Sequence, residues 1–330
     1  MLKGEYKFGL RFNDARISLE CDCKEIYQPL VEHFKHHLTD SLSAQAEIKL
    51  QLKKVVNPIP THSRLELRYF GLKVFGNSEH RYFTDFQSFL IMDSDGKKAR
   101  GFIVPETLKE MAGIFFTNIF FLHLLFEMLR HLGIYFIHSA GLISPEGKCY
   151  LFPSNAGEGK STITLYLIKE GYKYLSDDTV FLSRKENEIL ISGFERTSHI
   201  GEDLIERFEE LKPFKKKPGL EVIGKRKKLV ELEQVYPGRR LKEFKEPSAI
   251  IFPQRVERKE SRLRPLDKNQ ALKLVLSQSP FVFLNSPVSR AHLEILGELV
   301  KKSKVWILES GSDWLSEPKI LIRLLKEAVR

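Results

Sequence analysis

Cysteine is scarce in this chain of 330 residues, which contains only Cys21, Cys23 and Cys149. So small and odd a number excludes the disulfide framework of small secreted domains, and a zinc site built from cysteine alone would lack ligands. Residues 1–5 lead directly into alternating polar and apolar residues, without the apolar stretch of a secretory signal. We therefore expect a protein of the reducing cytoplasm.

Long apolar runs are also missing. A membrane-spanning helix needs roughly 20 consecutive apolar residues. The nearest approach is the segment 111–126, which is mostly Ile, Leu and Phe but is interrupted by Thr117, Asn118 and His123 and followed at once by Glu127. We predict a buried helix here and no membrane span. The alternative is a surface on which two copies pair in a homo-oligomer.

The hydrophobic and aromatic content of the chain excludes a disordered protein. Hydrophobic residues make up 42% of it and aromatic residues 11%, with 24 phenylalanines. This is enough apolar surface to build a core, whereas disordered chains lack it. The length suits two domains, since a domain typically holds about 100–200 residues. No internal repeat is visible.

The pattern of the first third predicts a small β-rich α+β domain over residues 1–104. Stretches such as 5–12 and 47–52 alternate between apolar and polar residues, as half-buried strands do. A helix is expected over about 24–38. We find no group of residues here that indicates a chemical reaction.

The remainder predicts an α/β domain. Pro105 opens a helical stretch to about Leu132, which we interpret as a connecting helix over residues 105–132. From 133 to 330, short apolar strands alternate with helical segments. This alternation is typical of a sheet covered by helices on both sides.

A phosphate-binding loop (P-loop) follows the apolar strand 149–152. The segment fits the pattern G-x-x-x-x-G-K-[ST], except that serine replaces the first glycine. In such loops, backbone N–H groups surround the phosphates, the lysine neutralises the γ-phosphate and the hydroxyl after it coordinates Mg²⁺. Ser154 could hold the first turn through a side-chain hydrogen bond. The expected nucleotide-binding residues are Ser154, Asn155, Ala156, Gly157, Glu158, Gly159, Lys160, Ser161 and Thr162.

Two adjacent carboxylates come shortly after this loop. A helix ending at Gly171 and a strand over 172–176 lead to Asp177 and Asp178, 17 and 18 residues after Lys160. Neighbouring residues of a strand point to opposite sides. One carboxylate can therefore bind Mg²⁺, together with the serine of the loop, while the other removes a proton from an attacking hydroxyl. The alternative is a polar turn without chemistry.

The stretch from His138 to Leu182 resembles the catalytic core of the HPr kinase/phosphorylase family, whose fold is related to that of phosphoenolpyruvate carboxykinase. The resemblance rests on a histidine at a strand end, the loop, a helix ending in glycine and the Asp-Asp pair. It implies that Lys160 and Ser161 serve ATP and Mg²⁺, that Asp177 and Asp178 share the general-base and metal roles, and that His138 lines the phosphate end of the pocket. Taken alone, His138 would as readily be a strand-end histidine held by structural hydrogen bonds.

The chain departs from this family in two respects. The family's E-I-R-G-[LI]-G signature is not recognisable, and residues 193–196 match it too loosely. The N-terminal region is also unlike that of the usual HPr kinases. The resemblance is therefore to a divergent member of the family, and the departures argue against HPr as the acceptor.

Most of the net charge of +10 lies in one segment, 212–245, which contains twelve lysines and arginines and four glutamates. The run Lys225–Lys228 is its densest part. Such a run is commonly a solvated face. It could also bind the transferred phosphate, or a nucleic acid. The scarcity of interleaved aromatic residues argues against nucleic acid.

These observations predict an ATP- and Mg²⁺-dependent kinase with an α/β, HPr kinase-like core. It would transfer a γ-phosphoryl group to a hydroxyl of a small molecule, peptide or protein serine. A non-catalytic nucleotide-binding regulator and a nucleic-acid-binding protein using residues 212–245 are the alternatives. A carboxykinase is less well supported, because no further metal-binding His or Lys constellation is recognisable. Which aspartate acts as the base stays open.

Overall fold

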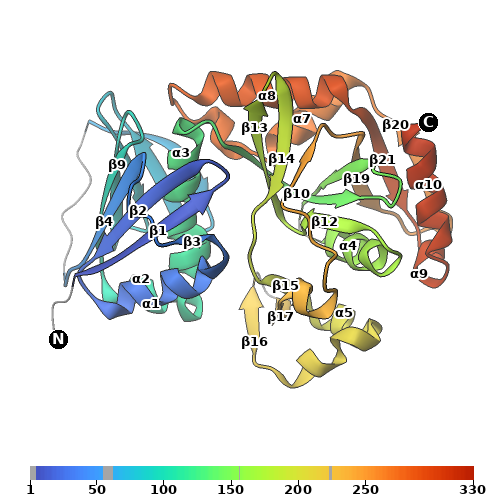
Figure 1. Ribbon diagram of the computed structural model, residues 1–330, viewed down its shortest axis with the longest axis horizontal. Coiled ribbons are helices and arrows are strands. Elements are labelled where there is room, and N and C mark those ends of the chain that lie inside the picture. Colours follow the sequence, from blue (N-terminus) through green and yellow to red (C-terminus); the bar gives the residue numbers. More distant parts are fainter. Residues whose placement is uncertain (1–4, 55–61, 156, 223–224) are drawn as a thin grey trace. The chain divides into compact units, whose positions relative to one another are not determined.

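The chain packs as two units, each built around its own large sheet, in the computed structural model (Figure 1). The structure describes residues 5–54, 62–155, 157–222 and 225–330. The first unit comprises residues 1–134 and 283–289, and the second comprises 135–282 and 290–330. The segment 105–132, which we expected to connect two domains, belongs to the first unit. A short segment from late in the sequence joins it there.

Nine strands of the described residues form the sheet of the first unit. Their order is β3-β1-β2-β4-β9-β8-β7-β6-β5, and β4 runs parallel to both β2 and β9. The strands expected at 5–12 and 47–52 are present as β1 and β4. The bounds are β1 Tyr6–Phe12, β2 Ala15–Cys21, β3 Leu38–Thr39, β4 Ala46–Leu52, β5 Arg64–Tyr69, β6 Leu72–Gly76, β7 His80–Thr84, β8 Phe89–Asp93 and β9 Lys98–Ile103.

The helices of the first unit are shorter than the sequence suggested. The helix expected over 24–38 ends early, as α1 (Lys24–His33) followed by the 3₁₀ turn η1 (Lys35–His37). The stretch expected as one helix over 105–132 is broken, because Met111 and Gly113 have positive φ angles of 49° and 86°. Its parts are α2 (Pro105–Lys109), the 3₁₀ turn η2 (Glu110–Gly113), the π-helix η3 (Phe115–Phe121) and α3 (Leu122–His131).

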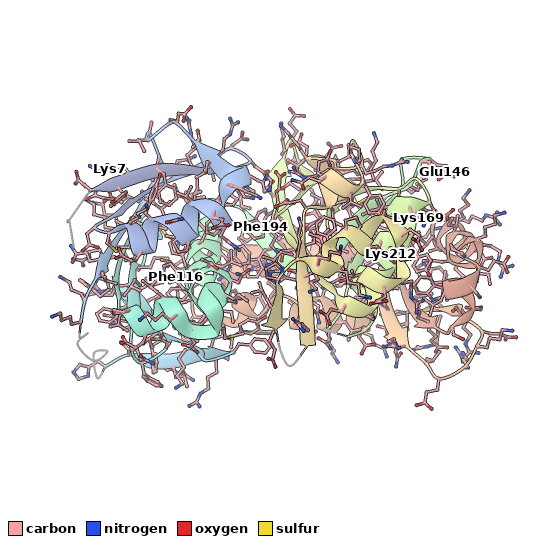
Figure 2. The ribbon with its side chains drawn as sticks, turned by 90° about the horizontal axis from the view of Figure 1, so that it is seen from below. Lys7, Phe116, Glu146, Lys169, Phe194 and Lys212 are labelled. Atoms are coloured by element: carbon pink, nitrogen blue, oxygen red, sulfur yellow. The ribbon has the colours of Figure 1, made fainter. Side chains whose placement is uncertain are left out.

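The apolar stretch at 111–126 supplies much of the core of this unit. Phe116, Phe120 and Phe121 are at most 1% exposed, and the rings of Phe34 and Phe121 lie 5.7 Å apart. Figure 2 shows Phe116 inside the unit and Lys7 at its surface. The predicted buried helical segment is therefore confirmed. Among the residues that the structure describes, no helix is both long and apolar enough to cross a membrane.

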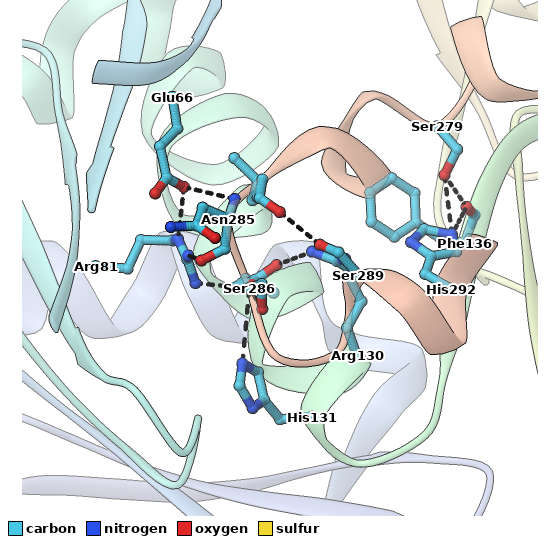
Figure 3. A network of polar contacts seen from close by, with 12 residues as sticks. Glu66, Arg81, Arg130, His131, Phe136, Ser279, Asn285, Ser286, Ser289 and His292 are labelled. Atoms are coloured by element: carbon cyan, nitrogen blue, oxygen red, sulfur yellow. Dashed lines mark hydrogen bonds and ion pairs between the residues drawn. The ribbon is translucent and has the colours of Figure 1, made fainter. Parts of the chain in front are cut away.

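Charged side chains are buried beside this apolar core (Figure 3). Glu127 is completely buried in α3, and its carboxylate accepts hydrogen bonds from Arg81 and Arg130. Burial alone would raise the pKa of Glu127, but a hydrogen bond from His131 and the two arginine charges lower it to about 2. The carboxylate thus stays ionised in the interior, because the positive charges of the two arginines compensate its negative charge.

The segment 283–289 completes this network. Arg81 donates to the carbonyl of Asn285 over 2.7 Å, and Ser286 donates to Glu127 over 2.8 Å. Arg130 also donates to the hydroxyl of Ser289 over 2.9 Å. The late segment therefore satisfies buried charges that the N-terminal part of the chain supplies.

The second unit has a mixed sheet with the order β18-β14-β13-β10-β11-β19-β21-β20, and β12 pairs with β10. Strand β11 runs antiparallel to β10 and parallel to β19. Alternation of strands and helices, as predicted, gives a mixed α/β architecture. The bounds are β10 Tyr135–Ile143, β11 Cys149–Pro153, β12 Lys173–Ser176, β13 Thr179–Lys185, β14 Glu188–Gly193, β18 Glu243–Lys245, β19 Ala249–Arg255, β20 Arg262–Pro265 and β21 Lys304–Ser310.

Helices cover both faces of this sheet, as we expected (Figure 1). Successive residues of β11 point to opposite faces: Tyr150 and Phe152 pack with α4 and α10, whereas Cys149 and Leu151 pack with α7 and α8. Cys149 is buried and free, and burial raises its pKa to about 12. The helices are α4 Lys160–Lys169, α7 Lys268–Ser277, α8 Ser289–Lys302 and α10 Lys319–Val329, with the short elements η5 Pro280–Phe283 and α9 Asp313–Ser316.

The positively charged segment folds largely into a small subdomain of the second unit. A three-stranded antiparallel sheet has the order β15-β17-β16. Its apolar side chains pack against α4 in the same core as the large sheet. The elements are β15 Ser198–Gly201, α5 Glu202–Arg207, η4 Glu209–Lys216, β16 Gly219–Val222, β17 Lys225–Val230 and α6 Leu232–Val235.

The buried network predicts that Glu127→Gln destabilises the protein by about 3 kcal/mol, because it removes a buried carboxylate that Arg81 and Arg130 share and leaves Arg81 paired with Glu66 alone. The matched control is Glu47→Gln, which removes an exposed pair with Lys98 and should cost at most about 1 kcal/mol. Urea unfolding of the full chain, followed by circular dichroism, measures both. Equal losses for the two variants would contradict this account.

Candidate functional site

The predicted phosphate-binding loop lies between the end of β11 at Pro153 and the start of α4 at Lys160. Gly157 and Gly159 both have φ angles of +95°, which side chains other than glycine rarely adopt. This backbone is the reason for glycine at these two positions. Ala156 lies outside the described residues. The strand–loop–helix arrangement that the sequence predicted is present.

Ser154 does not hold the first turn as we expected. Its hydroxyl is buried and has no hydrogen-bond partner among the described residues. Instead, residues far along the chain form hydrogen bonds with the loop. The side-chain amide of Gln278 donates to Asn155 Oδ1 over 2.9 Å, and the backbone N–H of Arg255 donates to Glu158 Oε2 over 3.2 Å. Asn155 and Glu158 are thus anchors of the loop in this structure.

Lys160 begins α4 and is 8% exposed. Its Nζ lies 2.6 Å from His138 Nε2 and 3.5 Å from the carbonyl oxygen of Ser154. Burial lowers the pKa of Lys160 to about 8, although the charges of Asp178 and Asp177 act in the opposite direction. The ammonium can donate to His138 only if that imidazole nitrogen is unprotonated, which places the ring proton on Nδ1.

Asp178 pairs with the other ring nitrogen of His138. Its Oδ2 lies 3.4 Å from His138 Nδ1, 2.6 Å from Arg196 Nη2 and 2.9 Å from the hydroxyl of Thr179. Burial would raise the pKa of Asp178, but Arg196 and His138 hold it well below its usual range. A continuous polar chain therefore runs from Lys160 through His138 and Asp178 to Arg196.

Asp177 has a different environment from its neighbour. Burial and the adjacent Asp178 charge raise its pKa, while Arg196 and a hydrogen bond with Ser198 partly oppose this. Asp177 lines a small cavity of about 20 Å³, together with residues that include Arg196, Ser198 and Arg240. This is room for about one water molecule. The two carboxylates thus differ in protonation behaviour as well as in partners.

Three residues of this site were not predicted from the sequence. Arg196 lies in the segment 193–196 that we had judged too loose to match a family signature. His199 follows three residues later, in β15, and burial lowers its pKa to about 4, with Arg196 and Lys227 contributing. Gln278 comes from the end of α7. A cation 18 residues after Asp178 was the only visible signal, and it does not stand out in a basic chain.

The basic residues of β17 have different surroundings. Lys228 is buried, and its Nζ donates to the carbonyl of Lys217 over 2.8 Å. Arg226 is exposed and pairs with Glu202 over 3.5 Å. The positive charge of Lys227 lowers the pKa of Lys160. The side chain of Lys225 lies outside the described residues.

The expected metal ligands lie at the start of α4 and at the end of β12. Ser161 and Thr162 are half-buried in the first turn of the helix. The described residues contain no cluster of three or more His, Cys, Asp and Glu side chains able to hold a metal ion. A magnesium ion bound by Ser161 and one of Asp177 and Asp178 would need phosphate oxygens as further ligands. The metal site stays a prediction.

Comparison with solved structures shows a distant structural likeness. No protein-family model matches the chain, and no curated protein matches it. A solved structure that is similar is described as the HPr(Ser) kinase/phosphatase from Coxiella burnetii. The two chains share 12% sequence identity with a TM-score of 0.30, and the similarity covers 58% of this chain and 97% of that one.

The pairing of Arg196 with Asp178 predicts that Arg196→Gln raises the pKa of Asp178 toward the ordinary range, because the nearest positive charge is lost. Carbon-13 NMR titration of the aspartate carboxyl groups measures this shift. The control is Arg226→Gln at an exposed position of β17, which should leave the titration of Asp178 unchanged. An Asp178 titration that is identical in wild type and Arg196→Gln would rule out the assigned role.

Proposed function

We propose that the second unit binds Mg-ATP and transfers its γ-phosphoryl group to a hydroxyl group of an acceptor. The observation that carries this proposal is the placement of Lys160. A buried ammonium at the N-terminus of α4 is linked through His138 to a carboxylate that stays ionised. A cation, a hydrogen-bonding loop and a carboxylate at one point are what phosphoryl transfer requires.

The loop has the features that a triphosphate needs. Two left-handed glycines let the backbone turn its N–H groups inward, and the start of α4 adds the positive end of a helix dipole. The space beside Gly159 is open, and the buried hydroxyl of Ser154 is a hydrogen-bond group that a phosphate oxygen could satisfy. These observations support nucleotide binding by residues 154–162.

The charges of the site also suit an anionic ligand. Lys160, Arg196 and Lys227 contribute positive charge around the carboxylates of Asp177 and Asp178. Arg196 already neutralises Asp178 through a close pair. The remaining positive charge would favour a phosphate group over a neutral ligand.

The two aspartates suit different tasks in the transfer. Asp178 is held ionised and is therefore suited to a metal ion or to orienting His138. Asp177, whose pKa is raised, is the better proton acceptor, because a base works best when its pKa approaches the working pH. When bound, Mg-ATP supplies the phosphoryl group and the metal charge. The acceptor oxygen bonds to phosphorus as the bond to ADP breaks, and the hydroxyl proton goes to the carboxylate.

Nucleotide binding is expected to depend on Lys160. Lys160→Ala should weaken Mg-ATP binding by about 100-fold or more, whereas Lys169→Ala, at the exposed end of the same helix, should leave it unchanged. Because the lysine is charged only below its pKa of about 8, wild-type affinity should fall as the pH rises through that value. Isothermal calorimetry at pH 7 and pH 9 measures both effects. Wild-type protein that binds no Mg-ATP at millimolar concentration would refute the proposal.

Turnover is expected to depend on the aspartates more than binding does. Asp177→Asn and Asp178→Asn should each keep the Mg-ATP dissociation constant within a few-fold but lower ADP formation by about 100-fold or more. ADP release from ATP in the presence of a pool of serine-containing peptides measures turnover. Asp203→Asn, at an exposed position of α5, is the control. Tight binding of ATP with no ADP formed by the wild type would indicate a nucleotide-binding regulator instead.

A further inference from the structure

The outward face of the sheet in the first unit has two halves with different side chains. Residues of the inward face, such as Leu90 and Met92, are completely buried, whereas most of the residues that alternate with them are half-buried or exposed. On β1, β2 and β4 the outward residues are mostly polar or charged, and Lys7 and Lys49 both pair with Glu20. On β6 to β9 the outward residues include aromatic rings.

Three phenylalanines lie at one end of this aromatic half. Strand register places four outward residues in one row across β6, β7, β8 and β9, namely Lys73, Thr84, Phe89 and Phe102. The ring centroids of Phe89 and Phe102 are 5.2 Å apart, and both side chains are half-buried. Phe86 lies in the connection from β7 to β8, and its ring contacts Lys73 at the end of the row. We call Phe86, Phe89 and Phe102 the aromatic row.

A lysine accompanies the aromatic row at each end. Lys73 Nζ lies 3.4 Å from the centre of the Phe86 ring, and Lys53 Nζ lies 5.9 Å from the centre of the Phe102 ring. Although Lys73 covers part of the Phe86 ring, that side chain remains 65% exposed. Rings and cations therefore alternate along this end of the sheet.

Two exposed arginines add to this positive charge. Arg68 lies opposite Lys73, and Arg100 lies two residues before Phe102 on the same face of β9. Within the part of the chain that the structure describes, no carboxylate pairs with either arginine or with the two lysines. Asp85 instead accepts hydrogen bonds from Thr107 and from two neighbouring backbone N–H groups. The four cations outnumber the exposed glutamates that follow β9 in α2 and η2, namely Glu106 and Glu110.

The backbone holds Phe86 in an unusual conformation. Its φ angle is 72°, in the left-handed region that an aromatic residue rarely adopts. The backbone N–H of Phe86 donates to the hydroxyl of Thr84 over 2.8 Å, which stabilises this turn. Strained residues of this kind are concentrated at binding and active sites. The connection thus presents a large apolar ring to solvent in a defined position.

A ligand that uses the whole aromatic row must carry flat rings and negative charges in alternation. The bases of single-stranded nucleic acid stack on aromatic side chains, and the phosphates between them pair with lysine and arginine. A duplex does not expose the faces of its bases in this way. The basic segment 212–245 lacks interleaved aromatic residues, whereas this face has them.

Other occupants use only part of these features. An acidic peptide would pair with the cations but would not bring a flat ring with each charge. A second copy of the chain would place the same unpaired cations face to face, which is unfavourable. An anionic membrane would contact the exposed ring of Phe86, but the half-buried rings of Phe89 and Phe102 lie within the sheet surface.

We propose that the outward face of β6 to β9 binds single-stranded nucleic acid. Bases stack on the aromatic row, and phosphates pair with Lys53, Lys73 and Arg100. All of these residues belong to the first unit, and none of them takes part in the proposed phosphoryl transfer. A failure of that transfer would therefore leave this site untouched.

The test uses the full-length protein and a fluorescein-labelled 12-nucleotide strand of mixed sequence, made as RNA and as DNA. Fluorescence anisotropy should show saturable binding of at least one form, weakened when salt rises from about 50 mM to about 200 mM. Phe86→Ala should weaken binding by about tenfold or more, because a stacked base is lost. Lys73→Gln should also weaken it and make it less dependent on salt.

Matched controls separate this face from other parts of the chain. Phe283→Ala removes another phenylalanine that is 67% exposed and should leave binding unchanged. Lys160→Ala and Arg226→Gln should also bind like the wild type, because the phosphate-binding loop and the basic segment are not involved. Since Phe86 is mostly exposed, its replacement should preserve the fold, which circular dichroism checks.

Three results would overturn the proposal directly: no saturation up to millimolar protein, a duplex of the same sequence bound as tightly as the single strand, or equal binding by wild type and Phe86→Ala. Binding that is lost in Arg226→Gln but kept in Phe86→Ala would assign nucleic acid to the basic segment and also overturn it. If the strands do not bind, but vesicles with anionic lipid bind and Phe86→Ala abolishes this, the face belongs to a membrane contact and the proposal is wrong.

Discussion

The polar chain from Lys160 to Arg196 is the constraint on which the second unit depends. An ammonium buried to this degree is costly unless neighbouring groups compensate its charge. Here the compensation passes through His138 to Asp178, which a second cation then stabilises. Strand β10, helix α4 and the connections that carry Asp178 and Arg196 must therefore keep their relative positions, because a shift of one residue would leave charges buried without partners.

The first unit also buries charged side chains, but there they stabilise the fold. Glu127 is buried between two arginines, and hydroxyl and carbonyl groups of 283–289 make further hydrogen bonds with these side chains. These partners all lie within the first unit, and the network holds structure. By contrast, the chain at Lys160 ends at a loop with open space beside Gly159. That difference distinguishes a structural cluster from a candidate site.

Local pattern was enough to predict some of this structure. Strand periodicity placed β1 and β4, a short apolar run placed β11, and the spacing of the loop and the Asp-Asp pair placed Lys160 and Asp178 on neighbouring elements. Arg196 and Gln278 could not be found in this way, since they reach the site from segments 36 and 118 residues away from Lys160. The break at Met111 was also invisible, because the apolar pattern continues across it while the backbone does not.

The segment 283–289 has a consequence for how the protein is made. The first unit is discontinuous in sequence, so the polypeptide passes between the units three times, after residues 134, 282 and 289. During synthesis, Arg81 and Arg130 emerge long before Asn285 and Ser289 exist to pair with them. The N-terminal unit can therefore reach its final packing only after most of the second unit has left the ribosome. The unit that begins the sequence is thus completed only at residue 289, shortly before the second unit is completed by residues 290–330.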